Sequence, residues 1–424
     1  MKARNRHALQ LLLAALLILA GCSVVIEGAE AGPFAKPGQE WPAWRGPYRN
    51  NLSLIVPQKL PEQMPVAWEH PMVGETYSGV AVDEGLVVAV DHERGKRDIV
   101  RCYKAEDGSL VWKQEWENTF MQMPWGSCPR ATPAIHEGMV YVVSALGKLK
   151  AFRLKTGELV WEKDYEEDFD GMLPMWGYSS SPLVADGKVI ANPGGQDASV
   201  VALDAATGEV IWKSPGMDAN YASFITATVN GKEQVVGYDL DNAVGRSLET
   251  GEVIWTKWLP PNQGFVVPSP VVADGALLVD ADGYLYKMTL GETGELPDEW
   301  EAENDRFDIG DSTPVVIGDI VLGVTSDGLT AVDTGDLSTL WTRAESAIGS
   351  LGGFANIIAE NGRALVLDEG GVLRLFEFDR SECREVGALE VCGGIRAHPA
   401  LVEGRLYLRS GGKLLCRKLS TDTE

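Results

Sequence analysis

The chain has 424 residues, and its 61 Asp and Glu against 37 Lys and Arg give a formal net charge of −24. Such acidity argues against nucleic acid and against anionic membrane surfaces as partners. The length alone would suggest two or three domains, but an internal repeat, described below, predicts a single one.

Residues 1–21 carry three cations followed by a Leu/Ala-rich core that ends in Leu19-Ala20-Gly21-Cys22. This stretch is typical of a secretory signal peptide, and it is too short to span a membrane. Its end resembles the bacterial lipobox, in which the Cys becomes the lipidated first residue of the mature protein. Removing the three cations changes the net charge from −24 to about −27.

We therefore expect a lipoprotein that is held to the membrane through Cys22. Ser23 after the Cys resembles the outer-membrane sorting pattern of envelope lipoproteins, so we expect the chain to face the periplasm from the outer membrane. Residues 22–40 are rich in Gly, Ala, Pro and Glu and are predicted to form a flexible tether. With Cys22 lipidated, five cysteines remain, so at least one thiol stays unpaired.

Residues 41–424 are predicted to form one domain, because a Thr-Gly-Glu-x-x-Trp run returns along them. The clearest copies are 156–161, 207–212 and 250–255, and 107–112 is a looser one. Successive anchor tryptophans are 44, 49, 51, 43, 45 and 41 residues apart, a spacing typical of a solenoid, propeller or array. We predict that these side chains pack one repeat against the next: Trp68, Trp112, Trp161, Trp212, Trp255, Trp300 and Trp341.

Each repeat contains about four short antiparallel strands, which is the composition of a propeller blade. The anchor run gives a strand, a turn at Gly and a second strand, and another Gly hairpin lies upstream of it. Seven such units are predicted at about 73–116, 128–165, 178–214, 222–258, 268–302, 311–344 and 354–391.

An eighth unit supplies only three strands, at 399–402, 405–409 and 413–419. Residues 65–71, with Trp68 in the anchor position, lie ahead of the first unit as a single strand without partners of its own. We predict that this strand completes the eighth blade, because ring closure leaves no exposed sheet edge. The predicted fold is an all-β, eight-bladed propeller.

The anchor run within Ala-x-Asp-x-x-Thr-Gly-Glu-x-x-Trp, as in residues 202–212, resembles the repeat of the pyrroloquinoline quinone (PQQ)-type propellers. The opening Trp-Pro-Ala-Trp-Arg-Gly-Pro at 41–47 is similar to the start of many bacterial PQQ-like propeller proteins. The resemblance implies one of two functions. One is that of the BamB-like lipoproteins of the outer-membrane assembly machinery, which act as cofactor-free scaffolds. The other is that of quinoprotein dehydrogenases, which hold PQQ and calcium in the central funnel.

The scaffold interpretation fits the lipobox, the length and the eight plain blades. Typical dehydrogenases of the family place a disulfide between adjacent cysteines over the quinone, and no two cysteines are adjacent in this chain. We expect a monomeric scaffold that binds other envelope proteins and needs no cofactor. The alternative is a PQQ-dependent oxidoreductase with calcium, or a propeller that binds a small ligand in its funnel.

Two loops ahead of innermost strands are unusually rich in Met and aromatic residues, at 121–126 and 172–178. Their equivalent places in neighbouring blades predict that they lie side by side, where they either form an adaptable binding surface or pack the blade junction. The candidates for the interaction face are Met123, Trp125, Met175, Trp176 and Tyr178.

The loops ahead of all the innermost strands are predicted to converge on one mouth of the channel. Convergent polar groups in a funnel form a candidate small-molecule site, although many propeller channels are merely wet and polar. The candidates are Arg130, Tyr221, Asp311, Asn356, Arg396 and His398, with an Asp311–Arg396 ion pair as one arrangement.

No residue is assigned to catalysis or to a metal. The sequence holds no Gly-x-Ser-x-Gly nucleophile elbow, no phosphate-binding Gly loop and no His pair with metal-ligand spacing. The run 280–283, Asp-Ala-Asp-Gly, resembles the start of a calcium loop but lacks the rest of that motif, so we interpret it as a hairpin turn.

Overall fold

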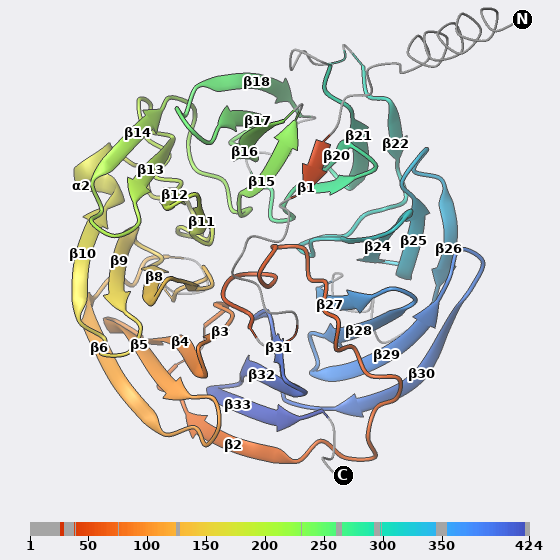
Figure 1. Ribbon diagram of the computed structural model, residues 1–424, viewed down its shortest axis with the longest axis horizontal. Coiled ribbons are helices and arrows are strands. Elements are labelled where there is room, and N and C mark those ends of the chain that lie inside the picture. The colour runs from red at the N-terminus through yellow and green to blue at the C-terminus, as the bar shows by residue number, and fades with distance from the viewer. Residues whose placement is uncertain are drawn as a thin grey trace, which may run out of the picture.

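The computed structural model describes residues 26–28, 38, 40–74, 76–123, 128–229, 231–259, 265–291, 297, 299–344 and 354–419. Eight antiparallel sheets stand around a central axis (Figure 1). Inner strands such as Ile320–Thr325 are buried at every position, as expected of a sheet covered on both faces by its neighbours. The outermost strands, as in Val210–Ser214, alternate buried with exposed side chains instead. The predicted all-β, eight-bladed propeller is confirmed.

The first four blades run in chain order, each from its innermost to its outermost strand. They are β3 (Ala81–Asp83), β4 (Leu86–Glu93), β5 (Lys96–Lys104) and β6 (Leu110–Asn118); β7 (Ala134–His136), β8 (Met139–Val143), β9 (Lys148–Arg153) and β10 (Leu159–Asp164); β11 (Leu183–Ala185), β12 (Lys188–Ala191), β13 (Val200–Asp204) and β14 (Val210–Ser214); β15 (Ile225–Val229), β16 (Lys232–Asp239), β17 (Asn242–Ser247) and β18 (Val253–Trp258).

The other four blades repeat the same order, except that the eighth takes its outermost strand from the start of the domain. They are β19 (Val271–Ala273), β20 (Ala276–Ala281), β21 (Tyr284–Met288) and β22 (Ala302–Asn304); β23 (Val315–Ile317), β24 (Ile320–Thr325), β25 (Gly328–Asp333) and β26 (Thr339–Arg343); β27 (Ala355–Glu360), β28 (Arg363–Asp368), β29 (Val372–Phe378) and β30 (Cys383–Glu390); β31 (Ala400–Val402), β32 (Arg405–Ser410), β33 (Lys413–Lys418) and β2 (Val66–Pro71).

Ring closure follows the prediction from the sequence. Strand β2 pairs antiparallel with β33, and Trp68 lies opposite Cys416. The buried Asp91 carboxylate on β4 then joins the last blade to the first, because Arg409 Nη2 on β32 lies 3.1 Å from its Oδ1. The chain thus closes the ring by strand pairing and by a buried ion pair.

The recurring Trp and the recurring Gly contact each other across blade junctions. Trp161 donates its Nε1 hydrogen to the carbonyl of Ala205 in the next blade, at 3.0 Å. A Cβ placed on Gly208 would lie only 2.7 Å from the same indole ring. The pairs Trp68–Gly108, Trp112–Gly157 and Trp212–Gly251 repeat this arrangement. The motif is therefore a packing device, as predicted.

Trp300 does not occupy the anchor position that the sequence predicts for it. In the fifth blade the anchor position is taken by Ala302, which lies opposite Lys287 on β21. In the sixth blade Trp341 holds the equivalent position, opposite Ala331 on β25. Trp300 instead lies 4.7 Å from the Tyr286 ring within its own blade. Spacing could not reveal this two-residue offset, because the intervals between the anchor tryptophans themselves vary from 41 to 51 residues.

The missing ring at Ala302 is compensated in the next blade. Leu337 takes the positive-φ position that Gly occupies elsewhere, at φ 58°, and its side chain is buried against Ala302. A residue with a side chain fits there because no indole fills the junction. Trp255 varies the pattern in a different way, since its Nε1 hydrogen goes to Gln234 in the same blade. The Nε1 hydrogen of Trp341 goes to the Asp379 carbonyl of the next blade, as at the regular junctions.

The opening segment from Trp41 to Ser53 crosses the channel and bonds to the inner strands from within (Figure 1). Trp41 pairs with Val82 on β3, and Leu52 forms a parallel bridge with Ala359 on β27. We call residues 41–53 the plug. The plug turns the predicted open channel into a blind cavity.

Two short elements lie outside the blade pattern. Strand β1 (Ile26–Gly28) pairs with β15 as a fifth strand, which departs from the predicted flexible tether over 22–40 at these three residues. Helix α2 (Tyr165–Phe169) follows β10 and is capped by the Asp164 side chain, which accepts from the amides of Glu166 and Glu167. Among the described residues no helix is long and apolar enough to cross a membrane.

The central cavity and the surrounding face

A cavity of about 280 Å³ opens on the axis, above the plug. All eight blades contribute to its wall through the loops ahead of their innermost strands, as the sequence predicted. Its lining residues are Trp44, Tyr77, Arg130, Thr132, Trp176, Ser179, Ser181, Tyr221, Ser223, Phe265, Val267, Asp311, Thr313, Phe354, Arg396 and His398. The structure therefore brings together five of the six funnel candidates.

A belt of hydroxyl groups holds the cavity wall in place. The amide of Thr132 donates to Ser181 Oγ at 3.0 Å, and the amide of Ser181 donates to Ser223 Oγ at 2.9 Å. The series continues in the same way: the Ser223 amide donates to Ser269 Oγ, and the Ser269 amide donates to Thr313 Oγ1. Because each bond joins one blade to the next, the belt fixes the radius of the cavity.

The floor of the cavity is built from the plug. Trp44 lies edge-on to His398, with ring centroids 5.5 Å apart. The guanidinium carbons of Arg45 and Arg49 lie 5.4 and 5.6 Å from the Trp44 ring centre. Burial and the nearby Arg45 charge lower the pKa of His398 to about 3, so its imidazole is neutral at pH 7.

Arg45 and Arg49 are buried cations that are held by backbone carbonyls. Arg45 Nη2 donates to Pro314 O at 2.5 Å, and Arg49 Nη1 donates to Phe224 O at 2.9 Å. Burial lowers the pKa of each guanidinium to about 9, and Arg49 adds to the effect on Arg45. Both groups therefore remain charged at pH 7 and tie the plug to the third, fourth and sixth blades.

The wall carries charge of both signs. Arg130 lies 5.5 Å from the Tyr77 ring centre and donates through Nη1 to Cys128 O at 3.0 Å. Burial raises the pKa of Asp311, and the Arg396 charge opposes the rise. Among the described contacts Arg396 forms its ion pair with Glu369, at 2.5 Å from Nε to Oε1, which replaces the predicted pair with Asp311.

An aromatic group covers the side of the cavity that the third, fourth and fifth blades form. The Phe265 ring lies 6.3 Å from Trp176 and 5.2 Å from Tyr221. The Trp176 amide also donates to Tyr221 Oη at 3.4 Å. These contacts place flat apolar surfaces beside the polar belt, as in many small-molecule sites.

The remaining predicted site residues have different positions. Asn356 is buried and donates to Ala397 O at 3.3 Å, behind the cavity wall. Met123 and Tyr178 are buried, so their assignment to an interaction face was wrong. Tyr178 packs edge-on against Tyr165 of α2 and donates to Pro193 O, contacts that composition could not predict.

The two Met-rich loops do meet, as predicted. A Cβ on Gly177 would lie 2.8 Å from Met123 Sδ, so the loops of neighbouring blades contact each other at this point. Met175 is 69% exposed, and Trp176 lines the cavity. Trp125 and Cys22 lie outside the described residues.

Exposed apolar side chains surround half of the cavity mouth. They all lie on the face where one blade's outermost strand connects to the next blade's innermost strand. We call this surface the apolar crescent, and it comprises Phe120, Met121, Met172, Leu173, Met175, Met217, Trp258 and Phe265. Met172 and Met175 are the most prominent, at 63% and 69% exposure.

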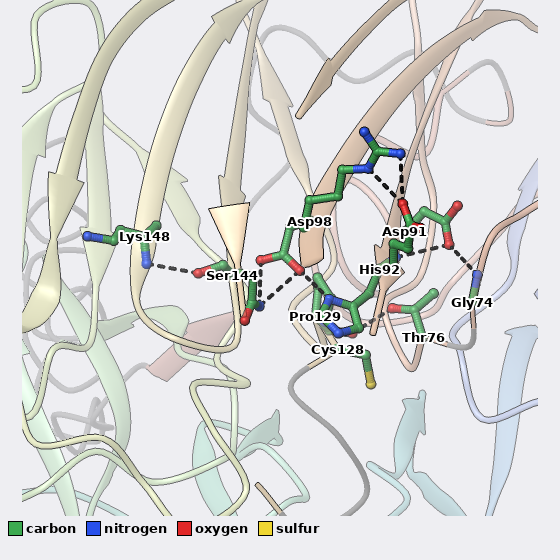
Figure 2. Close-up of polar contacts among 12 residues, drawn as sticks. Gly74, Thr76, Asp91, His92, Asp98, Cys128, Pro129, Ser144 and Lys148 are labelled. Carbon is green, nitrogen blue, oxygen red and sulfur yellow. Dashed lines mark hydrogen bonds and ion pairs between the residues drawn. The ribbon is translucent and has the colours of Figure 1, made fainter. Parts of the chain in front are cut away.

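A buried polar cluster supports the edge of this face between the first two blades (Figure 2). His92 Nδ1 lies 2.7 Å from Asp98 Oδ1, and the Asn118 amide donates to the same carboxylate. Thr76 donates to Pro129 O at 2.6 Å and so fixes the segment that leads to Arg130. His92, Asp98 and Asn118 bond to one another and do not line the central cavity, so we assign the cluster a structural role.

The described residues do not provide a calcium site. Calcium takes six to eight oxygen ligands, mostly carboxylates and carbonyls. Asp311 is the one carboxylate among the described lining residues, and two arginines share that wall. No three described His, Cys, Asp or Glu side chains are placed to share a metal ion. None of the five described cysteines forms a disulfide with another, so no disulfide among them lines the cavity either.

Sequence reasoning missed the hydroxyl belt and the plug. The belt had a signal, because Ser or Thr precedes Pro at Thr132, Ser181, Ser269 and Thr313, each directly ahead of an innermost strand. The plug had only its unusual Trp and Arg content, which carries no periodicity from which a position on the axis could be predicted.

Comparisons with known proteins point to two groups. The chain is 24% identical to the outer membrane protein assembly factor BamB of Yersinia pestis over 263 residues, which are 61% of each chain. It is 27% identical to the quinohemoprotein alcohol dehydrogenase ADH-IIG of Pseudomonas putida over 199 residues, 46% of this chain but 26% of that enzyme. Both matches thus span less than two thirds of the relative's length.

The crystal structure of BamB from Moraxella catarrhalis superposes with a TM-score of 0.59 at 16% identity, covering 85% of this chain and 99% of that one. At this identity the likeness concerns the fold. A family model described as outer membrane protein assembly factor BamB matches residues 61–192 and 96–343, well over half of the 424 residues. The chain belongs to that family.

Proposed function

We propose that this protein is a lipid-anchored propeller of the cell envelope that acts as a scaffold in outer-membrane protein assembly. Family membership supports the assembly role, and the predicted lipid on Cys22 supports the location. The observation that carries the proposal is the apolar crescent, which leaves eight large apolar side chains exposed on one face. Such a surface on a soluble domain is typical of a site for protein contact.

The chemistry of the crescent suits a protein partner. Met side chains are flexible and polarizable, and they adapt to partners of different shape. Trp258 and Phe265 provide rigid anchors of the kind that contribute most of the binding energy in interfaces. The crescent follows the second to fifth blades, so a partner could cover several blades without blocking the opposite face.

The proposal can be tested by co-purification from envelope extracts. The double variant Met172→Glu/Met175→Glu puts two charges into the proposed interface, and we expect it to lose the assembly proteins that the wild type retains. Ile211→Glu is the matched control, because Ile211 is 46% exposed at the opposite end of an outer strand. Retention of every partner by the double variant, or equal loss by the control, would refute the proposal.

A quinoprotein dehydrogenase is the alternative function, and some relatives carry that name. The cavity offers aromatic walls of the right kind but does not offer the carboxylates of a calcium site. Titration with PQQ and calcium, with alcohol-dependent dye reduction as the readout, separates the two functions. Stoichiometric binding with dye reduction would overturn the scaffold proposal.

A further inference from the structure

The central cavity is a cationic site in a strongly acidic protein. Arg130 and Arg396 lie on its wall, and Arg45 and Arg49 lie beneath the Trp44 floor. The chain as a whole carries a formal charge of −24. Four guanidinium groups close to the axis of such an acidic protein suggest that the cavity attracts an anion.

The two arginines below the floor have no carboxylate partner among the described residues. Their described hydrogen bonds all go to backbone carbonyls, those of Asn50, Pro314, Phe224, Ser181 and Pro182. The Nε atoms of both groups are buried without an acceptor. Buried charges without a counter-ion destabilise the fold, and these two project a positive potential into the adjoining cavity.

The other charged groups leave this potential in place. Glu369 neutralises Arg396 through their ion pair, and His398 is neutral at pH 7. Asp311 is the one described carboxylate of the wall, and burial raises its pKa. The positive charge beneath the floor therefore comes from Arg45 and Arg49, whose described hydrogen bonds all go to neutral backbone carbonyls.

The walls also limit what can enter. Trp176, Tyr221 and Phe265 form a flat apolar side, and the hydroxyls of Thr132, Ser181 and Thr313 supply hydrogen-bond donors and acceptors. The volume of about 280 Å³ suits a molecule of one or two rings. A hydrated inorganic ion would leave the aromatic side without a partner.

We propose that the central cavity binds a small organic anion, a carboxylate on an aromatic or similarly flat apolar body, without a metal ion. The carboxylate pairs with Arg130, and the body lies against Trp176 and Phe265. The ligand supplies the counter-charge that Arg45 and Arg49 lack. The site goes beyond the scaffold role and does not depend on it, since the crescent surrounds the cavity mouth without forming its floor.

The test compares two probes of the same shape that differ in charge, naphthalene-2-carboxylate and naphthalene-2-carboxamide. Purified full chain in EDTA is titrated with each, and quenching of tryptophan fluorescence and heat of binding are measured. Trp44 and Trp176 line the cavity and report occupancy. We expect the carboxylate to bind at least tenfold more tightly than the amide, to raise the melting temperature and to weaken with salt.

Arg130→Gln is expected to weaken carboxylate binding at least tenfold and to leave amide binding unchanged. Arg153→Gln is the matched control, because the Arg153 side chain is 58% exposed on the outer part of the same blade. Trp176→Ala, on the loop, should weaken both probes, and it serves as the second variant if Arg130→Gln fails to fold. Equal affinity for the two probes, no binding of the carboxylate, or an unaffected Arg130→Gln would overturn the proposal.

Discussion

The indole ring of Trp161 lies directly against Gly208 of the next blade, where a Cβ would come within 2.7 Å of it. Gly208 also has a φ of 74°, in the left-handed region that favours glycine. Two independent requirements thus select the same residue. The recurring Thr-Gly-Glu-x-x-Trp run is the visible result, since each of the first four blades supplies the Gly for the Trp of the blade before it.

Gly208→Ala should therefore lower the free energy of unfolding by about 2–4 kcal/mol. Backbone strain at positive φ contributes about 1 kcal/mol, and overpacking against Trp161 contributes the rest. Gly187→Ala provides the control, because Gly187 has a φ of 66° but no atom within 4 Å of the added Cβ. Urea unfolding of both variants measures the difference, and equal losses would contradict the interlock.

Trp212→Ala should cost about 3–5 kcal/mol, as the loss of a large buried aromatic side chain does. The ring packs on Gly251, and its Nε1 hydrogen goes to Leu248 O at 3.1 Å, so both contacts disappear together. Thermal unfolding is the measurement. A melting temperature unchanged within error would refute the packing role of the anchor tryptophans.

Asp91 makes ring closure sensitive to pH. Burial alone would raise its pKa, but hydrogen bonds from the Val73 amide and Arg101, with the Arg409 charge, bring the pKa below its ordinary value. A lowered pKa means that the carboxylate stabilises the fold above its unfolded-state pKa of about 4, and that this contribution is lost as pH falls.

Asp91→Asn should accordingly cost about 3–5 kcal/mol at pH 7, because it leaves Arg409 buried without its partner. The difference in free energy of unfolding between the variant and the wild type should become smaller as the pH falls below about 4. Asp186→Asn is the control, since that carboxylate is 70% exposed. A gap that stays constant from pH 7 to pH 3 would contradict the assignment.

Cys22→Ser should move the protein from the membrane fraction to the soluble periplasmic fraction, because lipidation requires the thiol. Cys383→Ser, which alters a cysteine on β30 of the seventh blade, should leave the protein on the membrane. Fractionation and incorporation of labelled fatty acid measure the outcome. Membrane association of Cys22→Ser at the wild-type level would contradict the anchor.

The fold could be predicted from the sequence because each copy of the repeat indicates the strands and the turn of one blade. The strand at 65–71 was assigned to the last blade from Trp68 and from the missing fourth strand of the eighth unit, and the structure pairs it with β33. The prediction was wrong at Trp300, because the hydrogen-bond register that moves Ala302 into its place leaves no trace in spacing.

The site was predictable in part, for a similar reason. Propeller topology brings the loops ahead of the innermost strands together, so Arg130, Asp311 and His398 could be placed on one cavity. Side-chain direction within a loop depends on tertiary contacts, which is why Met123 proved to be buried. The plug depends on long-range contacts of Arg45 and Arg49 that no local pattern records.

The most direct test of the scaffold account is site-specific photo-crosslinking in intact cells. A photoreactive amino acid replaces Met175 on the apolar crescent, and in a second strain it replaces Ile211 on the opposite face. The account predicts a discrete crosslink to an outer-membrane assembly protein from position 175 and none from position 211. Crosslinks from neither position, or the same crosslink from both, would contradict it.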